Sequence, residues 1–183
     1  MAPQPRRLFM YGQPSDLPLL DWAWVDAELA AAGIYWVTAS GGDRPHPRPV
    51  WGIWANERLH LSIGSPVVAR LLQQDPGLTV HLASSTDVVV VEGTVVGLVD
   101  DTAVLRAYND KYESNYTIEE YGPLTGVAPT SVLAWRAEGW AGRDGFREAG
   151  RWRFQPPPVT SAEPDLRDEL SRPGGDEPRS RSR

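Results

Sequence analysis

The sequence predicts a mainly β protein, an antiparallel barrel of six or seven strands with short helices appended to it. Two observations support this prediction. Segments rich in β-branched and aromatic residues follow one another in hairpin order, with turn signals between them. Residues at helical spacing occur only in short stretches that interrupt these strands. With 183 residues, the chain is long enough for one domain with a core and too short for two comfortable ones.

A helix and a strand open the predicted folded unit. Asp21 is a helix cap and Gly33 a stop signal, and the apolar residues between them recur at helical spacing. The next segment, Ile34–Ser40, is β-branched and aromatic and runs into a turn at 41–43. The chain therefore begins with a helix followed by a strand.

Two further strands complete a predicted meander. The segment Arg48–Ala55 alternates as a strand does, and Asn56-Glu57 makes a tight link to the next strand, Arg58–Ile63. Apolar residues occupy one face of this third strand, whereas His60 and Ser62 share the other.

The second half of the unit alternates helices with longer strands. Ser65 caps a helix that ends at Gln74, and Asp100 or Asp101 caps a second helix. The predicted strands cover residues 78–84, 88–99, 131–140 and 146–154. The strand at 88–99 is apolar on both faces, which favours a central or interfacial position.

Composition limits the location and the partners of the protein. A formal net charge of -6 argues against nucleic acid or an anionic membrane surface as the main partner, because either would repel an acidic protein. No stretch is typical of a signal peptide or a membrane span, so we expect a cytoplasmic protein. Without cysteine there is no thiolate ligand or nucleophile, and the three histidines lack metal-like spacing. The sequence predicts no metal site.

The two ends differ from the middle of the chain. Residues 1–19 are rich in proline, and we expect an extended N-terminal arm. Residues 20–154 carry the strand and helix signals and form the predicted domain. Residues 155–183 are rich in proline, serine and charge and have almost nothing to bury, which predicts a disordered C-terminal tail.

The ordered motifs of the folded unit resemble the pyridoxamine 5'-phosphate oxidase-like family. After the first helix come "YWVTAS", "RPHPRPVWGIW" and "RLHLSIG"; after the second come "LTVHL" and "VVVVEGTV", and finally "GWAGRDGFREAGRWRF". The resemblance implies a Greek-key split β-barrel that binds FMN or the deazaflavin coenzyme F420, and a homodimer with flavin sites at the subunit interface. It does not imply vitamin B6 chemistry, because the arginine-containing C-terminal segment of true pyridoxamine phosphate oxidases is missing.

The resemblance assigns cofactor contacts to the second strand. Arg48 is expected to bind phosphate or ribityl oxygens, while the backbone of Val50, Trp51 and Gly52 meets the ring edge. The forked donors of a guanidinium suit a phosphate, and Gly52 permits close approach. From the residues alone, Arg48 can equally be a solvated strand end, and Trp51 can equally belong to the core.

Three further residues are expected near the cofactor. Ser62 matches the family's hydroxyl on the third strand that donates to phosphate, and Arg70 lies on the following helix. The N-terminus of that helix is itself an anion site. Relatives usually carry a lysine in this helix, where this chain has Val68. Trp140 lies where relatives cover the flavin with a chain from the partner subunit, although a tryptophan at a strand end is often only a core cap.

Two classes of function follow from the resemblance. The first is an oxidoreductase that uses FMN or F420 and transfers a hydride to or from a small organic substrate. The second is a non-enzymatic flavin-binding or haem-binding protein. The cofactor carries the redox chemistry in the first class, so no catalytic acid or base need be conspicuous, and none is identified here. The tyrosine-rich segment 108–124 is a candidate substrate lid.

Overall fold

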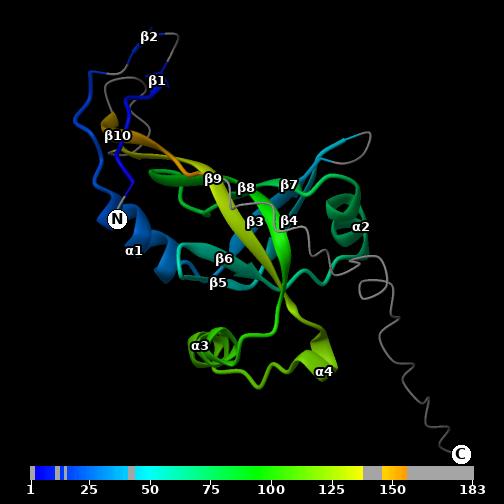
Figure 1. Cartoon of the computed structure of the whole chain (residues 1–183). Coiled ribbons are helices and arrows are strands. Elements are labelled where there is room, and N and C mark those ends of the chain that lie inside the picture. Colours follow the sequence, from blue (N-terminus) through cyan, green and yellow to red (C-terminus); the bar gives the residue numbers. More distant parts are fainter. Residues whose placement is uncertain (1–2, 11–12, 15, 41–43, 138–145, 156–183) are drawn as a thin grey trace, which may run out of the picture.

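We describe the protein from a computed structural model, which covers residues 3–10, 13–14, 16–40, 44–137 and 146–155 of the chain. One curled antiparallel sheet dominates these residues (Figure 1). Its strands lie in the order β4-β3-β7-β8-β9-β6-β5, and β10 pairs with β9. The prediction of a mainly β fold with appended helices is confirmed. The strands of this sheet are β3 (Tyr35–Ala39), β4 (His46–Val50), β5 (Gly52–Ala55), β6 (Arg58–Leu61), β7 (Gly77–His81), β8 (Asp87–Val99), β9 (Leu124–Ala137) and β10 (Phe146–Arg153).

Trp51 joins the two ends of the sheet. β4 pairs with β3 at one end and β5 pairs with β6 at the other, yet Trp51 alone separates β4 from β5 in the chain. The sheet therefore curls until its ends meet, as the strands of a barrel do. The sequence predicted one unbroken strand over Arg48–Ala55, and the break at Trp51 corrects this prediction.

The longest strand, β9, begins at Leu124, seven residues before the predicted start at Ser131. Gly126 and Pro129 lie in its first half, and both residue types are depleted in strands. This half is a strand because Val127 pairs with Leu59 of β6 on one side and with β8 on the other. The predicted end of the strand, at Trp140, lies outside the described residues.

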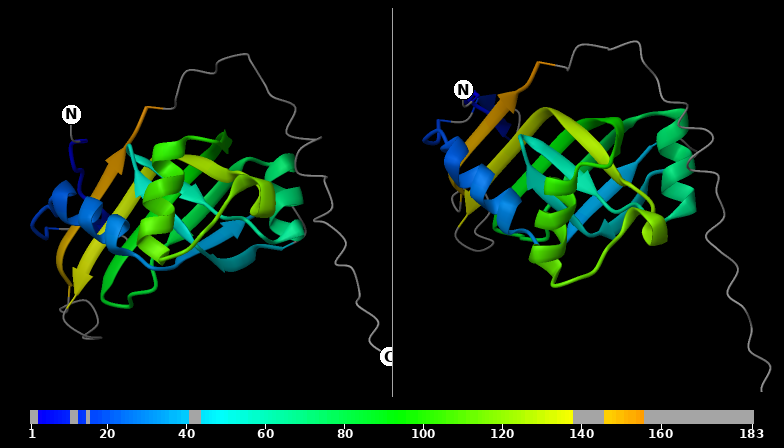
Figure 2. Two further views of the ribbon diagram at one scale, coloured as in Figure 1. Left: turned by 90° about the horizontal axis from the view of Figure 1, so that it is seen from below. Right: turned by 60° about the horizontal axis from the view of Figure 1, so that its bottom comes forward.

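Helices cover the ends and one side of the barrel. They are α1 (Trp22–Ala31), α2 (Pro66–Gln74), α3 (Thr102–Tyr112) and α4 (Ile118–Tyr121). The predicted caps at Asp21 and Ser65 are confirmed, and of the two candidates Asp100 and Asp101 the structure selects Asp101; each of the three capping side chains accepts a hydrogen bond from a first-turn N–H. α1 and α2 lie at opposite ends of the barrel, and α3 packs against β5 (Figure 2).

The main core fills the barrel, and a second, smaller core lies under α3. Alternate residues of β3, β7, β8 and β9 point inward and are fully buried, together with the apolar face of α1. Under α3, Val104 and Tyr108 pack on Ile53 of β5 and on Leu124 of β9. This helix also buries His60, which the sequence placed on the polar face of its strand. Burial lowers the pKa of His60.

The N-terminal segment lies along β10. It contains two short strands, β1 (Phe9–Met10) and β2 (Gln13–Pro14), which pair with each other in an antiparallel manner. The backbone of Arg6 exchanges hydrogen bonds of 2.7 and 2.9 Å with Arg151, and the side chain of Leu8 is buried. Backbone pairing and one apolar contact therefore fasten this segment to the edge of the sheet.

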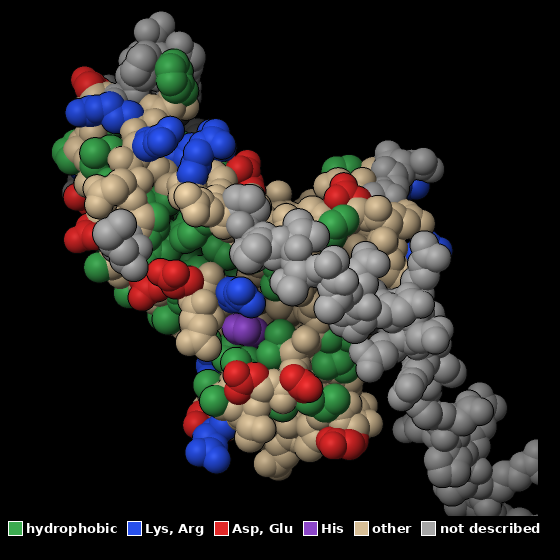
Figure 3. All heavy atoms as spheres, in the orientation of Figure 1, with side chains coloured by type: hydrophobic (Ala, Val, Ile, Leu, Met, Phe, Trp, Pro, Cys, Tyr) green, Lys and Arg blue, Asp and Glu red, His purple; other side chains and the backbone are tan. Residues whose placement is uncertain are grey.

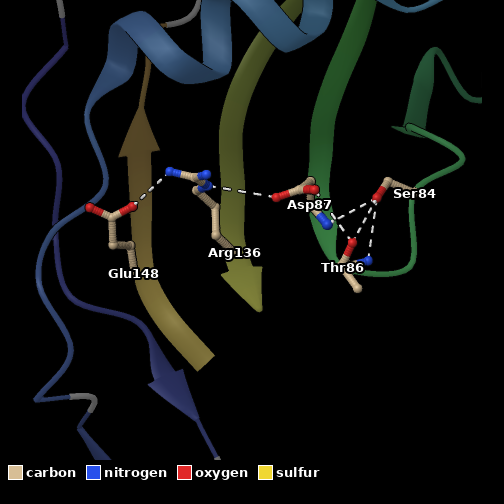
Figure 4. Close-up of polar contacts among 5 residues, drawn as sticks. All are labelled: Ser84, Thr86, Asp87, Arg136 and Glu148. Carbon is tan, nitrogen blue, oxygen red and sulfur yellow. Dashed lines mark hydrogen bonds and ion pairs between the residues drawn. The ribbon is translucent and has the colours of Figure 1, made fainter. Parts of the chain in front are cut away.

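Arg136 bridges three strands on the outer surface (Figure 4). Its Nε atom lies 3.6 Å from Oδ1 of Asp87 on β8, and its Nη1 atom lies 3.3 Å from Oε2 of Glu148 on β10. The backbone register places both acids directly opposite Arg136. Each of these side chains is partly exposed, so water weakens the attraction.

Candidate functional site

An open groove of about 440 Å³ lies where the chain passes from one end of the sheet to the other. The end of β4, the Trp51 link, the residues after β6 and the N-terminus of α2 all contribute to its walls. The residues that line it are Ile34, Arg48, Pro49, Val50, Trp51, Ser62, Gly64 and Ser65.

Backbone pairing holds these elements together at the groove. The amide of Ser62 donates a hydrogen bond of 2.9 Å to the carbonyl of Trp51, which ties the end of β6 to the link between β4 and β5. Three residues later the chain reaches Ser65, whose hydroxyl accepts a hydrogen bond of 3.4 Å from the amide of Val68. The helix α2 therefore begins at the groove.

The groove offers hydrogen-bond donors but no carboxylate among its described lining residues. Arg48 is exposed, and its Nη1 atom donates a hydrogen bond of 2.7 Å to the carbonyl of Pro47. The positive end of the α2 dipole lies at Ser65. A guanidinium and a helix N-terminus at one groove favour an anionic group such as a phosphate.

Trp51 gives the groove an aromatic surface. The side chain is 51% exposed although it is large and apolar. Its ring stacks on Tyr112 of α3, with the ring centroids 5.0 Å apart and the planes inclined by 10°. Because Tyr112 supports the indole from one side, Trp51 is held in place as a flat surface.

The backbone of Gly52 is bound by α3. The hydroxyl of Tyr112 lies 2.9 Å from the Gly52 amide and 2.7 Å from its carbonyl, and Nζ of Lys111 donates to that carbonyl at 3.2 Å. A Cβ atom at Gly52 would lie 2.7 Å from the carbonyl oxygen of His60. Because Gly52 has no side chain, β5 can lie this close to β6.

Lys111 lies behind the groove in a partly buried aromatic environment. Its Nζ atom donates to the hydroxyl of Tyr35 at 3.2 Å, and it lies 5.0 Å and 5.5 Å from the ring centroids of Tyr35 and Tyr112. Burial lowers the pKa of Lys111 to about 8 and raises that of Tyr35. Lys111 therefore connects α3 to β3 and β5 through polar contacts.

The structure brings together four of the seven residues expected to bind a cofactor. Arg48, Val50, Trp51 and Ser62 line the groove. Gly52 lies beside it without lining it, and Arg70 is exposed on α2 outside the lining. Trp140 lies outside the described residues. Val68, which stands where relatives were expected to carry a lysine, is buried in the core.

Sequence reasoning missed Lys111 as a neighbour of the groove, and it placed Tyr112 on a helix and in a candidate lid but not against Trp51. One signal was present, because Lys111 is the only lysine of the chain. Tyr108 and Tyr112 also stand four residues apart, which places them on one face of a helix. Neither observation predicts the strands against which this helix face packs.

The residues that the structure describes contain neither a metal site nor a membrane-spanning helix. No three of their histidine, aspartate or glutamate side chains gather as metal ligands would. No helix among them has the length and apolarity needed to cross a membrane.

A curled antiparallel sheet whose ends meet at a groove beside a helix N-terminus is the arrangement of a split β-barrel. Comparison with known proteins agrees at the level of fold. No family model and no curated protein matches the sequence. Solved structures do match, and the two described next have TM-scores of 0.50 and 0.52.

One is a Listeria innocua protein whose name assigns it provisionally to the pyridoxamine 5'-phosphate oxidases, with a TM-score of 0.50 and 16% identity over 61% of this chain and 95% of the other. The second is a conserved hypothetical protein from Mycobacterium tuberculosis, with a TM-score of 0.52 and 17% identity over 67% and 88% of the two chains. A structure named F420 reductase matches at a TM-score of 0.48 and 18% identity over 58% and 94%. The chain therefore has the split β-barrel fold of pyridoxamine 5'-phosphate oxidase-like proteins.

Proposed function

We propose that the groove binds a flavin nucleotide and that the protein is a flavin-dependent oxidoreductase acting on a small organic substrate. The observation that carries this proposal is the combination of an exposed aromatic face and a cationic side chain in one groove, Trp51 and Arg48. A flavin nucleotide has the matching parts, a flat apolar ring and a phosphate. The volume is also suitable, since small-molecule sites usually measure about 300–1,000 Å³.

Each part of the lining has a definite task in this proposal. Arg48 and the N-terminus of α2 at Ser65 bind the phosphate, and the hydroxyl of Ser62 donates to it. The indole of Trp51 and the side chains of Ile34 and Val50 provide apolar contact for the ring. Arg70 contributes at most long-range attraction to the phosphate, because its exposed side chain does not line the groove.

The cofactor, once bound, supplies the ability to accept and donate a hydride. The chain orients it and limits the access of water to one side of the ring. Stacking of Tyr112 on Trp51 holds the aromatic surface still, and the hydrogen bonds of Tyr112 and Lys111 to Gly52 hold α3 in position. FMN is our first candidate for the cofactor and F420 the alternative, because both carry a phosphate beside a flat ring.

A homodimer belongs to this proposal. The outer face of the sheet carries a row of half-buried side chains in register across four strands, Trp36, His81, Val90 and Leu133. Trp36 and His81 stack with their ring centroids 6.2 Å apart. A sheet face in contact with solvent usually carries polar side chains, whereas this row is largely apolar. A second copy of the chain would cover it.

A non-enzymatic role as a haem-binding protein has less support. Haem proteins of this kind need a ligand such as histidine for the iron. The described residues that line the groove include no histidine, and His60 is buried under α3 with its Nε2 atom 3.2 Å from the carbonyl of Ala55.

Titration of the purified protein with FMN, F420 and haemin tests the proposal. We expect saturable quenching of the fluorescence of FMN or F420, together with tryptophan quenching that is smaller in Trp51→Ala. Absence of binding by both FMN and F420 at micromolar protein would overturn the proposal. Tight binding of haemin alone would establish the alternative.

A further inference from the structure

Arginine side chains gather where the N-terminal segment lies against β10. The backbones of Arg6 and Arg151 exchange two hydrogen bonds, so these residues stand directly opposite each other in an antiparallel pair. Side chains of directly opposed residues lie on the same face of a sheet. Arg153 stands two residues further along β10 and shares that face. Because Trp152 between them is fully buried, the face with the arginines is the outer one.

This arginine cluster, Arg6, Arg151 and Arg153, is a local positive patch. Figure 3 shows Lys and Arg side chains gathered over the N-terminal segment and β10, at the upper left. Like charges that face each other directly destabilise a pair of strands. The cluster is therefore an unfavourable arrangement by itself, in a chain whose formal net charge is -6.

Described acidic side chains neutralise the cluster only in part. The Nη2 atom of Arg151 lies 3.4 Å from Oε2 of Glu92, and its Nε atom donates to the hydroxyl of Ser131 at 3.1 Å. Arg6 and Arg153 are both exposed. Neither of them forms an ion pair within 4.0 Å with an acidic residue that the structure describes. Two guanidinium groups of the cluster are thus available to an anionic partner.

The chain itself carries an anionic segment that matches the cluster. Residues 163–169 read EPDLRDE, with four acidic residues and one arginine. The first of these acids stands ten residues after Arg153. A chain of that length has an r.m.s. span of about 17 Å, whereas neighbouring strands lie about 4.8 Å apart. The acidic segment can therefore reach every member of the cluster.

Covalent attachment favours this segment over a separate anion. A short linker gives the attached group an effective concentration in the millimolar range. A nucleic acid, by contrast, would have to approach a chain of net negative charge. The forked donors of a guanidinium also match the two oxygens of a carboxylate.

We propose that the arginine cluster binds the acidic segment 163–169 of the same chain, so that the chain after β10 returns over the outer face of the sheet. Arg6 belongs to the N-terminal segment and Arg153 to β10, so carboxylates that pair with both join the two elements from outside. The same contact offsets the repulsion between Arg6 and Arg151. This inference rests on neither the cofactor nor the homodimer proposed above.

Paramagnetic relaxation in the full chain tests the contact. The chain has no cysteine, so Ser171→Cys provides a single site for a nitroxide label beside the acidic segment. At low salt we expect broadening of the backbone amide signals of Arg6 and Arg153, while that of Arg106 on α3 stays sharp. Raising the salt from about 0.01 M to 1 M shortens the Debye length from about 30 Å to about 3 Å and should remove most of the broadening.

Neutral variants of the arginines identify the basic side of the contact. Arg6→Gln combined with Arg153→Gln should reduce the broadening at residue 151 and its neighbours several-fold. Both changes affect exposed side chains, and the unlabelled amide spectrum of the variant checks that the fold is retained. Arg106→Gln is the matched control, because it removes one exposed arginine from α3 and should leave the broadening unchanged.

Neutral variants of the acids identify the other side. Replacing the four acids of the segment 163–169 by their amides should reduce the broadening as much as the arginine variant does. Asp176→Asn with Glu177→Gln, the next acids along the chain, is the control and should not.

Several results would overturn the proposal. One is an absence of broadening at the cluster at low salt, or broadening that neither set of neutral variants reduces. Another is broadening centred on a different surface of the protein. A third comes from mixing spin-labelled chains with isotope-labelled chains that carry no nitroxide: broadening in that sample would assign the contact to the acidic segment of another copy.

Discussion

The Nζ atom of Lys111 and the hydroxyl of Tyr35 lie 3.2 Å apart, although 76 residues separate them in the chain. This contact joins α3 to the inner side of β3, and the same amine donates to the carbonyl of Gly52. No described acidic side chain forms an ion pair with Lys111 within 4.0 Å. The amine is therefore desolvated without a compensating charge, which lowers its pKa to about 8.

The first prediction is that stability rises with pH across the titration of Lys111. The folded protein releases this proton near pH 8, whereas the unfolded chain keeps it to about 10.5. The unfolded state thus binds more protons in this window, and the free energy of unfolding increases with pH. Above pH 10 the raised pKa values of Tyr35 and Tyr112 act in the opposite direction. Urea midpoints from pH 7 to 10 measure the effect, and Lys111→Met should remove the rise.

An independent measurement is available because the chain has a single lysine. The rate of acylation at Lys111, followed by mass spectrometry of its peptide, reports the pKa of this amine directly. A midpoint near that of free lysine would contradict the lowered value.

The second prediction concerns the phosphate. Arg48→Ala should weaken FMN binding about ten- to a hundredfold, the scale of losing a charge-assisted hydrogen bond of about 1.5–3 kcal/mol. Riboflavin, which has no phosphate, should bind the variant and the parent alike. Arg70→Ala is the control, because Arg70 is a nearby exposed arginine that does not line the groove. Equal losses for FMN and riboflavin in Arg48→Ala would place Arg48 on another part of the ligand.

The third prediction concerns the approach of β5 to β6. Gly52→Ala places a Cβ atom 2.7 Å from the carbonyl oxygen of His60 and from Cδ2 of Leu61, so a strand has to move. We expect a loss of about 1–3 kcal/mol in the free energy of unfolding, as for overpacked cores. Gly33→Ala, where nothing lies within 4 Å of the new Cβ, should change it by less than about 0.5 kcal/mol. Chemical denaturation compares the two, and equal midpoints would refute the packing argument.

The fourth prediction concerns the surface bridge at Arg136. Arg136→Gln removes contacts with Asp87 and Glu148, and its guanidinium also lies 5.4 Å from the ring centroid of Trp24. Because the charges are partly exposed, we expect a loss of about 1 kcal/mol or less that shrinks as salt is added. Arg106→Gln on the exposed side of α3 is the control. A cost that does not change with salt would point to packing on Trp24 instead.

The fifth prediction tests the homodimer. Val90 stands in the middle of the row on the outer face of the sheet, between His81 and Leu133. If a second copy covers this row, light scattering should find a dimer for the parent and a monomer for Val90→Lys. Ala107→Lys, at an exposed position of α3, should remain a dimer. A parent that is monomeric at micromolar concentration would contradict the prediction.

Features that depend on neighbouring residues could be predicted from the sequence. Helix caps are local, since a side chain such as Asp101 binds an amide two residues away; the caps at Asp21 and Ser65 were predicted correctly, and the third was narrowed to Asp100 or Asp101. Runs of β-branched and apolar residues bounded by turn signals likewise located β3, β6, β7 and β8. The ordered motifs then predicted the split barrel, and they selected Arg48, Val50, Trp51 and Ser62, which do line one groove.

Contacts between distant segments were decided by the tertiary structure. Residues 124–130 carry weak strand signals and become a strand only because β6 and β8 lie on either side of them. Gly52 and Tyr112 are 60 residues apart, and their hydrogen bonds depend on how α3 packs against the barrel. Nothing near Trp51 in the chain indicates its stacking on Tyr112. Local patterns specify which face of each element is buried. The element that packs against that face is decided by the closure of the whole sheet, because closure is stabilised by many long-range contacts together.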